Sequence, residues 1–222
     1  MAIKLLPWLL LLALLTACQA KPERSPLATP ADWTLPYGKW GFAFFTPKAL
    51  PATVTHVRIV DTEGYRSQFT MLDSTQDNPY SIGKWYDKVK RGPHFNQAIY
   101  PPQYMLFCWD SIIDKKTYQT EIFFGEPVWK KMKNPADYKD MFGEPVWFKT
   151  MLFGLAPEGK VRIWLQDDGR HPNYPVPVIK QQTFSDDKLD FCKGITRHSK
   201  GYGYTQTTQD FIKGKTYPYG NW

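Results

Sequence analysis

The chain has 222 residues, of which 42% are apolar, 16% aromatic and 22% charged, and its formal charge at pH 7 is +7. These fractions exclude an intrinsically disordered chain, a coiled coil and a collagen-like repeat. The 19 prolines and 15 glycines disfavour long helices and favour strands joined by turns, and the three cysteines are too few for a disulfide-built scaffold.

The first 18 residues have the pattern of an export signal. Lys4 precedes an apolar run from Leu5 to Leu15, which is too short to span a bilayer because a spanning helix needs about 20 residues. The run ends in Leu15-Thr16-Ala17-Cys18. This resembles the bacterial lipobox, in which an aliphatic and two small residues precede a cysteine that receives diacylglycerol. We expect residues 1–17 to be removed and Cys18 to be lipidated; the alternative is an ordinary secretory signal with a chance cysteine.

Residues 18–32 are expected to form a flexible tether between the lipid and the folded part. They are rich in proline and poor in apolar side chains, which is typical of an extended linker. Two or three acyl chains anchor a protein firmly, whereas a single chain binds only marginally. Gln19 follows the cysteine and, by resemblance to bacterial lipoprotein sorting, favours the outer membrane. We therefore expect a protein on the periplasmic face of the outer membrane, with one globular domain over residues 33–222.

Apolar and alternating runs predict strands through the first half of this domain. In residues 53–60, Thr55, Val57 and Ile59 share one face, which is the period of a strand. A turn at residues 61–64 then leads into a hairpin partner. A short helix is expected at residues 81–89. The expected strands are 40–46, 53–60, 65–72, 103–109 and 117–124.

One hexapeptide, Phe-Gly-Glu-Pro-Val-Trp, occurs at residues 124–129 and again at 142–147. Each copy has a proline near a first helical position with a glutamate before it, and Asn134 between them is a candidate cap, so short helices are expected around residues 126–140. Two copies are too few for a solenoid. We expect a local duplication that places Trp129 and Trp147 in the core; the alternative is that they form a ligand-binding pair.

The last third of the chain predicts further strands at residues 160–166 and 174–184, with a turn at 167–169. Pro175 and Pro177 confine part of the second strand to a sheet edge, because proline has no N–H for the ladder. Residues 201–222 are expected to add an outer strand or to wrap the domain. The fold class is therefore mainly β, an antiparallel sheet or sandwich with a few short helices.

The two remaining cysteines, Cys108 and Cys192, leave two interpretations open. The oxidising periplasm permits a disulfide. Cys108, however, lies in an apolar run, where a free cysteine is often simply buried.

The charge pattern and the missing motifs argue for binding rather than catalysis. The basic residues form only short clusters, so they make either a solvated basic face or a contact surface for an acidic partner or lipid headgroups. An exported protein is not expected to meet nucleic acid. The sequence has no G-x-S-x-G elbow, no H-E-x-x-H motif and no glycine-rich nucleotide loop, and neither Asp167-Asp168 nor Asp186-Asp187 has EF-hand spacing.

We therefore expect a non-enzymatic protein without metal or cofactor. A hydrolase with an unrecognised site is the hypothesis we rank lowest. Most tryptophans are expected in the core, while some aromatic side chains can line a surface for a protein or a sugar. The candidates for that surface are Trp129, Trp147, Tyr202, Tyr204 and Trp222.

Several stretches together resemble a known bacterial family. They include residues 40–47, the run 53–64, Leu106-Phe107-Cys108-Trp109-Asp110-Ser111, and Gly154-Leu155-Ala156-Pro157-Glu158-Gly159 before Trp164. This pattern is similar to the DUF2931 family of bacterial lipoproteins, over roughly residues 33–180. The family has no assigned catalytic residues, so none is carried over. The duplicated hexapeptide is not part of the pattern.

The resemblance implies an immunity lipoprotein, because members of such families often stand beside type VI secretion toxins, including lipases. A lipid tether concentrates an inhibitor at the membrane where such an effector acts. The expected partner is therefore a secreted effector protein. The alternative is an envelope lipoprotein that binds peptidoglycan or another glycan through exposed aromatic side chains.

Overall fold

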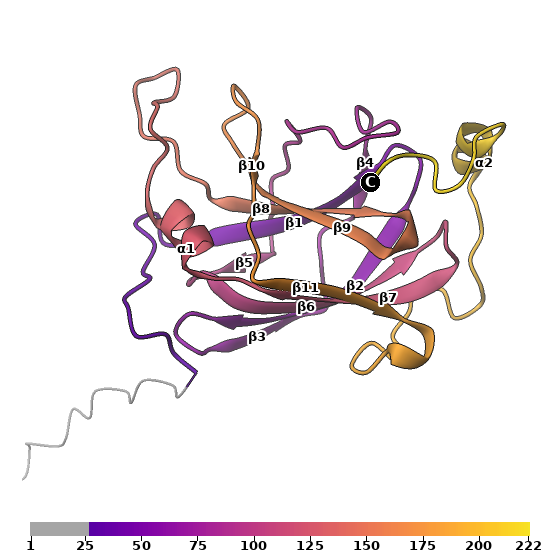
Figure 1. Cartoon of the computed structure of the whole chain (residues 1–222), viewed down its shortest axis with the longest axis horizontal. Coiled ribbons are helices and arrows are strands. Elements are labelled where there is room, and N and C mark those ends of the chain that lie inside the picture. Colours follow the sequence, from indigo (N-terminus) through magenta and orange to yellow (C-terminus); the bar gives the residue numbers. More distant parts are fainter. Residues whose placement is uncertain (1–26) are drawn as a thin grey trace, which may run out of the picture.

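The computed structural model describes residues 27–222, so the expected signal, Cys18 and most of the tether lie outside the described residues. Within that range the chain is mainly β, with two sheets and two short α-helices (Figure 1). The strands are β1 (Trp40–Pro47), β2 (Ala52–Asp61), β3 (Arg66–Phe69), β4 (Gln76–Asn78), β5 (Gln97–Ala98), β6 (Pro102–Ser111), β7 (Lys116–Phe123), β8 (Thr150–Ala156), β9 (Lys160–Leu165), β10 (Tyr174–Pro175) and β11 (Lys180–Ser185). The helices are α1 (Glu126–Lys133) and α2 (Gln206–Ile212), with 3-10 turns η1 (Pro157–Gly159) and η2 (Asp186–Lys188).

The two sheets differ in strand direction. In the described chain, one sheet has six strands in the order β10-β9-β8-β1-β4 with β5 also paired to β1, and the other has five in the order β11-β7-β6-β2-β3. Every pairing in the second sheet is antiparallel, as expected. In the first sheet β1 runs parallel to both β8 and β4. The expectation of antiparallel pairing fails at β1, because parallel partners come from distant parts of the chain and local periodicity does not reveal them.

The core lies between the two sheets, which pack face to face as a sandwich (Figure 1). Phe44 of β1 packs against Phe107 of β6, with ring centroids 5.1 Å apart, and Phe153 of β8 lies 5.6 Å from the same ring. The apolar run at residues 40–46 is buried along its whole length, because the six-stranded sheet is covered on its outer face as well.

Residues 81–91 provide part of that outer cover and do not form the helix expected at 81–89. The Trp85 ring packs against the rings of Phe45 and Trp164, with centroids 5.7 and 5.5 Å away. Gly83 adopts a φ of 68°, a conformation that a continuing right-handed helix does not allow. The Trp85 ring instead covers part of the outer face of the six-stranded sheet.

The C-terminal segment wraps the domain rather than adding a strand. Its helix, α2, was not expected from the sequence. Trp222 lies with its ring 5.2 Å from that of Trp85, and the Asn221 N–H donates to the Gly83 carbonyl over 2.8 Å. The chain end thus closes over the 81–91 segment.

Residues 174–184 were expected as one return strand but divide between the sheets. β10 pairs with β9 at one edge, whereas β11 pairs with β7 in the opposite sheet. Pro175 lies in β10 at the sheet edge, as expected, and Pro177 lies in the break, where it cannot donate to a ladder.

The folded body begins upstream of Trp33. The Thr29 N–H donates to the Thr62 carbonyl over 2.8 Å, and the Gln103 side chain donates to the Leu27 carbonyl over 2.7 Å. Across residues 27–222, none of the helices has the length and apolar character needed to cross a bilayer.

Cys108 and Cys192 are joined in a disulfide, which resolves the open alternative. Cys108 belongs to β6, and Cys192 lies in the loop after η2. Both are fully buried in a small cluster on the outer face of the five-stranded sheet. The bond therefore fastens that loop to the sheet.

Candidate partner-binding site

The two copies of the hexapeptide have different structures. The first copy forms the start of α1, with Gly125 in an extended conformation as its N-cap. Phe124 is 2% exposed, and Val128 and Trp129 are buried. The Trp129 indole N–H donates to the Pro102 carbonyl over 2.7 Å, and its ring meets that of Trp33 edge-on. The expectation that Trp129 fills the core is confirmed.

Helix α1 ends at Lys133, so the helical structure expected over residues 126–140 covers only its first half. Asn134 does not begin a new helix. Its backbone N–H and its side-chain amide both donate to the Lys130 carbonyl, and its backbone is extended. Asn134 therefore completes the end of α1, and the following Pro135 prevents continuation.

The second copy is a tight turn rather than a helical turn. The Asp140 carboxylate accepts hydrogen bonds from the backbone N–H groups of Phe142 and Glu144, each over 2.8 Å. The Asp140 N–H donates to the Glu144 carbonyl over 2.8 Å, and Gly143 has a φ of 83°. An aspartate that collects the following N–H groups stabilises a turn in competition with a helix.

The turn presents two large apolar side chains to solvent. Met141 and Phe142 are each 79% exposed. They lie at the tip of the segment between α1 and β8, which rises as a narrow loop beyond the sandwich (Figure 1). We call Met141 and Phe142 the apolar tip. Exposed apolar side chains next to each other on a projecting loop are typical of interaction sites.

The loop that carries the tip is held firmly at its base. The Ala136 N–H donates to the Val146 carbonyl over 2.8 Å, and the side chain of Val146 is buried. The Tyr138 hydroxyl donates to Asp167, and the Arg170 guanidinium donates to the Lys139 carbonyl. These contacts join both arms of the loop to each other and to the turn after β9.

Trp147 is only partly in the core, where we expected it, and is partly exposed at the surface. It is half-buried, and its ring lies 5.7 Å from that of Tyr37. It also lines a hollow of about 320 Å³ beside the loop. Three carboxylates and one ammonium group contribute to that hollow, from Asp140, Asp167, Asp168 and Lys149.

Asp167, Asp168 and His171 form a cluster whose possible metal-ligand atoms lie within 4.8 Å of one another. These ligand atoms are already engaged. One Asp167 oxygen accepts from the N–H groups of Gly169 and His171 over 3.0 and 2.9 Å, and the other accepts from Tyr138. Asp168 pairs with Arg170 over 2.9 Å. The cluster therefore stabilises the turn beneath the loop.

Electrostatics keep the Tyr138 hydroxyl in its donating form. Burial raises its pKa first, and the hydrogen bond to Asp167 and the charge of that carboxylate raise it further. Tyr138 therefore remains protonated over the physiological range and continues to donate to Asp167.

The other three aromatic candidates make contacts within the fold and do not gather into one surface. The Tyr202 hydroxyl donates to Asp110 over 3.1 Å, and its ring stacks on His198. The Tyr204 hydroxyl donates to the Ile113 carbonyl over 2.8 Å. Trp222 packs on Trp85. These residues stabilise the C-terminal wrap.

Sequence reasoning missed the apolar tip, although a signal for it exists. Residues 140–143 read Asp-Met-Phe-Gly. Aspartate at the first position and glycine at the fourth are preferred in a type I turn, which places Met141 and Phe142 at its exposed centre.

Comparison with known proteins gave one match. The model of a family described as "Protein of unknown function (DUF2931)" matches residues 19–220. Neither the comparison with curated proteins nor that with solved structures found a match.

Proposed function

The chain belongs to the DUF2931 family, and we propose that it is a non-enzymatic lipoprotein on the periplasmic face of the outer membrane that binds a secreted effector and neutralises it, as an immunity protein does. The observation that carries this proposal is the apolar tip. A protein that blocks another must present a surface to it, and the tip is an exposed apolar surface on a turn whose backbone is fixed by hydrogen bonds.

The energetics favour a partner at the tip. Removing a Met or Phe side chain from water contributes about 1.5–3 kcal/mol each. Because the Asp140 hydrogen bonds and the anchored arms already fix the turn, little conformational entropy is lost when the tip is buried. Aromatic residues and Met are also enriched where protein interfaces are fully buried.

The surroundings of the tip indicate the chemistry of the partner. Glu144 and Asp137 are exposed on the two arms of the loop together with Lys139, and the adjacent hollow has three carboxylates against one lysine, so the carboxylates outnumber the cationic groups. This acidic setting is unfavourable beside anionic lipid and favourable beside a basic rim. The tip therefore suits an apolar pocket with basic residues around it, such as the entrance to an effector's active site.

The disulfide and the expected anchor fit the same location. A buried disulfide is typical of proteins that fold in an oxidising compartment such as the periplasm. A lipid on Cys18 would hold the domain near the membrane and raise its effective concentration against an effector that arrives there.

Competition between strains tests the proposal. A strain that lacks this protein should lose viability beside a sibling strain that attacks it through a secretion system, and the wild-type gene should restore survival. The Phe142→Asp variant should fail to restore it, because a charge would enter the apolar pocket. Met71→Asp is the matched control, since Met71 is 84% exposed on a different loop.

Immunoblots should show equal amounts of all variants. The proposal is wrong if deletion leaves survival unchanged. If Phe142→Asp protects as well as the wild type, the tip is not the contact that the partner uses.

Labelling with a clickable palmitate analogue tests the anchor separately. The wild-type protein should be labelled and fractionate with membranes, and Cys18→Ser should do neither, because the serine hydroxyl cannot accept the diacylglycerol. An unlabelled wild-type protein would contradict the lipoprotein assignment.

Binding of glycans through exposed aromatics has less support, because the five residues chosen for it make contacts within the fold and are not brought together. Sedimentation with purified sacculi is the measurement that would revive it.

A further inference from the structure

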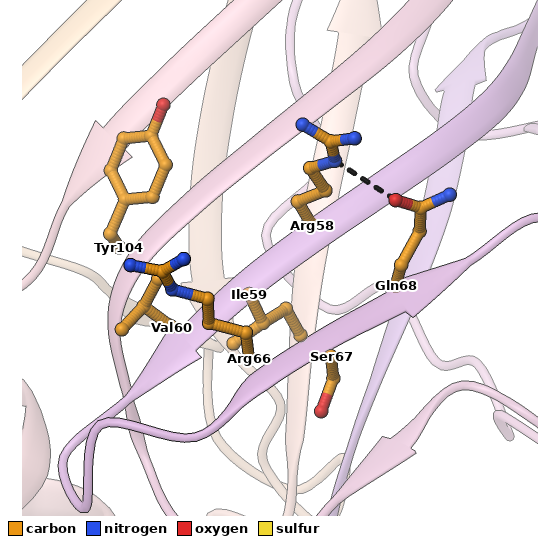
Figure 2. A pocket seen from close by; sticks show the side chains of 7 residues that line it. All are labelled: Arg58, Ile59, Val60, Arg66, Ser67, Gln68 and Tyr104. Atoms are coloured by element: carbon orange, nitrogen blue, oxygen red, sulfur yellow. Dashed lines mark hydrogen bonds between the residues drawn. The ribbon is translucent and has the colours of Figure 1, made fainter. Parts of the chain in front are cut away.

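A groove lies on the outer face of the five-stranded sheet, away from the apolar tip. It has a volume of about 480 Å³ and is formed by β2, β3 and β6. Small-molecule sites commonly have volumes of this order. Figure 2 shows its side chains, and the lining residues are Arg58, Ile59, Val60, Arg66, Ser67, Gln68 and Tyr104.

Two arginines enter this groove from neighbouring rows of the sheet. Arg58 of β2 lies opposite Gln68 of β3, and in the next row Val60 lies opposite both Arg66 and Tyr104. Neighbouring rows on one face are about 7 Å apart. Figure 2 shows the two guanidinium groups directed to different ends of the groove, so the exposed Arg66 side chain must turn toward Arg58 for both arginines to hold one ligand between the rows.

Arg58 is held in position before any ligand arrives. Its Nε donates to the Gln68 side-chain oxygen over 2.9 Å, and its guanidinium carbon lies 3.5 Å from the centre of the Phe191 ring. Among the described residues, its two terminal nitrogens make no hydrogen bond or ion pair. A fixed guanidinium with a free edge is a preorganised fork for an oxyanion.

Phe191 is itself fixed by its neighbours in the chain. Cys192 is tied to β6 by the disulfide, and the N–H groups of Cys192 and Asp190 both donate to the buried Gln119 side chain, over 3.0 and 3.3 Å. The loop after η2 therefore forms a rigid support for Arg58.

Arg66 is exposed and, within residues 27–222, has neither a hydrogen bond nor an ion pair from its side chain. Figure 2 shows its guanidinium extended across the groove beside Val60 and toward Tyr104. The side chain of Val60 and the ring of Tyr104 give this part of the groove an apolar character. A ligand whose charged group binds the arginines could therefore place an apolar or ring-bearing part against Val60 and Tyr104.

The charges around the groove favour a doubly charged anion. Burial raises the pKa of Tyr104 to about 12, with further contributions from the charge of Glu121 and its hydrogen bond, so its hydroxyl is uncharged at neutral pH. Glu121 and Asp190 act on Tyr104, but neither lines the groove. Two arginines match the charge of about −1.5 to −2 on a phosphate monoester better than the single charge of a carboxylate.

We propose that this groove binds an organic phosphate, with the phosphate between Arg58 and Arg66 and the organic part against Val60 and Tyr104. The proposal is independent of the effector-binding function, because it concerns a different surface and needs no protein partner.

Calorimetric titration of the full-length protein in a non-ionic detergent tests the proposal, with phenyl phosphate as the probe and phosphate-free buffer. Phenyl phosphate should bind, and phenol, which lacks the charge, should not. Arg66→Gln and Arg58→Gln should each weaken binding by about tenfold, because each removes charge-assisted hydrogen bonds. Arg162→Gln, at an exposed arginine of the other sheet, is the matched control and should leave binding unchanged. Thermal unfolding curves should show that all variants are folded.

Two further probes separate the sources of the phosphate. Inorganic phosphate should bind more weakly than phenyl phosphate, and equal affinity would overturn the role of Val60 and Tyr104. Flotation with phosphatidylcholine vesicles that contain phosphatidic acid, a lipid with a phosphate monoester headgroup, compared with pure phosphatidylcholine, distinguishes a lipid headgroup from a soluble phosphate. If phosphatidic acid increases flotation of the wild-type protein and Arg66→Gln loses that increase, the ligand is the lipid headgroup. If phosphatidic acid does not change flotation of the wild-type protein, which still binds phenyl phosphate, the ligand is a soluble phosphate. The proposal is overturned if phenyl phosphate does not bind the wild-type protein, or binds the Arg58→Gln, Arg66→Gln double variant equally well.

Discussion

The two copies of Phe-Gly-Glu-Pro-Val-Trp offer a comparison inside one molecule. In the first copy Phe124 is 2% exposed and the glycine is the N-cap of a helix; in the second Phe142 is 79% exposed and the glycine has a φ of 83°. Six identical residues thus build a core element in one place and a surface projection in the other. The difference must come from the residues around them.

The neighbouring residues explain the difference in physical terms. Two positions before the first copy stands Ile122, buried in β7, whereas the same position before the second copy is Asp140, whose carboxylate binds the N–H groups of the turn. After the first copy the chain continues with residues 130–133, which suit a helix, and after the second it enters β8. Propensity within the hexapeptide is a weak preference that these flanking contacts override.

The largest expected effect separates the two phenylalanines. Phe124→Ala should lower the free energy of unfolding by about 3–5 kcal/mol, because it leaves a cavity in the core. Phe142→Ala should change it by no more than about 0.5 kcal/mol, because the side chain is exposed. Urea denaturation of both variants makes the measurement, and similar losses would show that the second copy is also packed.

The second-largest expected effect is a difference between the two tryptophans in the unfolding free energy that each substitution costs. Trp129→Phe removes the donor to the Pro102 carbonyl and leaves that buried oxygen without its partner, which should cost about 1–3 kcal/mol of unfolding free energy. Trp147 is half-buried and its indole N–H has no hydrogen bond to a described residue, so Trp147→Phe should cost less. Thermal melts of both proteins provide the test, and an equal cost would contradict the assigned roles.

These outcomes bear on how much the sequence alone can tell. The strands near residues 40–46, 53–60, 103–109 and 117–124 were predicted because apolar and alternating patterns are local. The parallel neighbours of β1 and the separation of β10 from β11 depend on contacts between distant segments, which such patterns do not encode.

The candidate site was harder to predict than the fold. Their large aromatic side chains made Trp129, Tyr202 and Tyr204 candidates for a binding surface, but all three make contacts within the fold. The hexapeptide predicts a helical turn at both copies, and this prediction is wrong for the second. The hydrogen-bonding capacity of Asp140 carried the missing information.

The glycines of the two copies, Gly125 and Gly143, should differ less in the stability that an alanine substitution costs. Gly143→Ala forces an alanine into the left-handed region and should cost about 1 kcal/mol of stability. Gly125 has an extended backbone, and an added methyl group would crowd the side chain of Ile179, which is 74% exposed and can shift, and would make an ordinary contact with Pro127. Gly125→Ala should therefore cost less. Denaturation midpoints decide the order, and the reverse order would contradict the two backbone conformations.

The smallest expected effect is a loss of stability at low pH through Asp168, in the turn beneath the loop that carries the second copy. Burial raises the pKa of Asp168, but hydrogen bonds from the Arg170 backbone and side chain, together with the positive charge of Arg170, outweigh it and lower the pKa to about 2 from 3.8. A lowered folded-state pKa adds stability above the unfolded value, and this stability is lost as pH falls through about 2. Asp168→Asn should therefore show a shallower loss over this range in acid titrations followed by circular dichroism; an unchanged slope would remove Asp168 from the account.

Photocrosslinking during an attack by a competing strain tests the outward role of the second copy most directly. A photoreactive phenylalanine analogue replaces Phe142 in one strain and Met71 in another, and the adducts are identified by mass spectrometry. The account predicts that a secreted effector is crosslinked at position 142 and not at position 71. An effector captured at position 71 alone, or protection of the cells with no adduct at position 142, would contradict it.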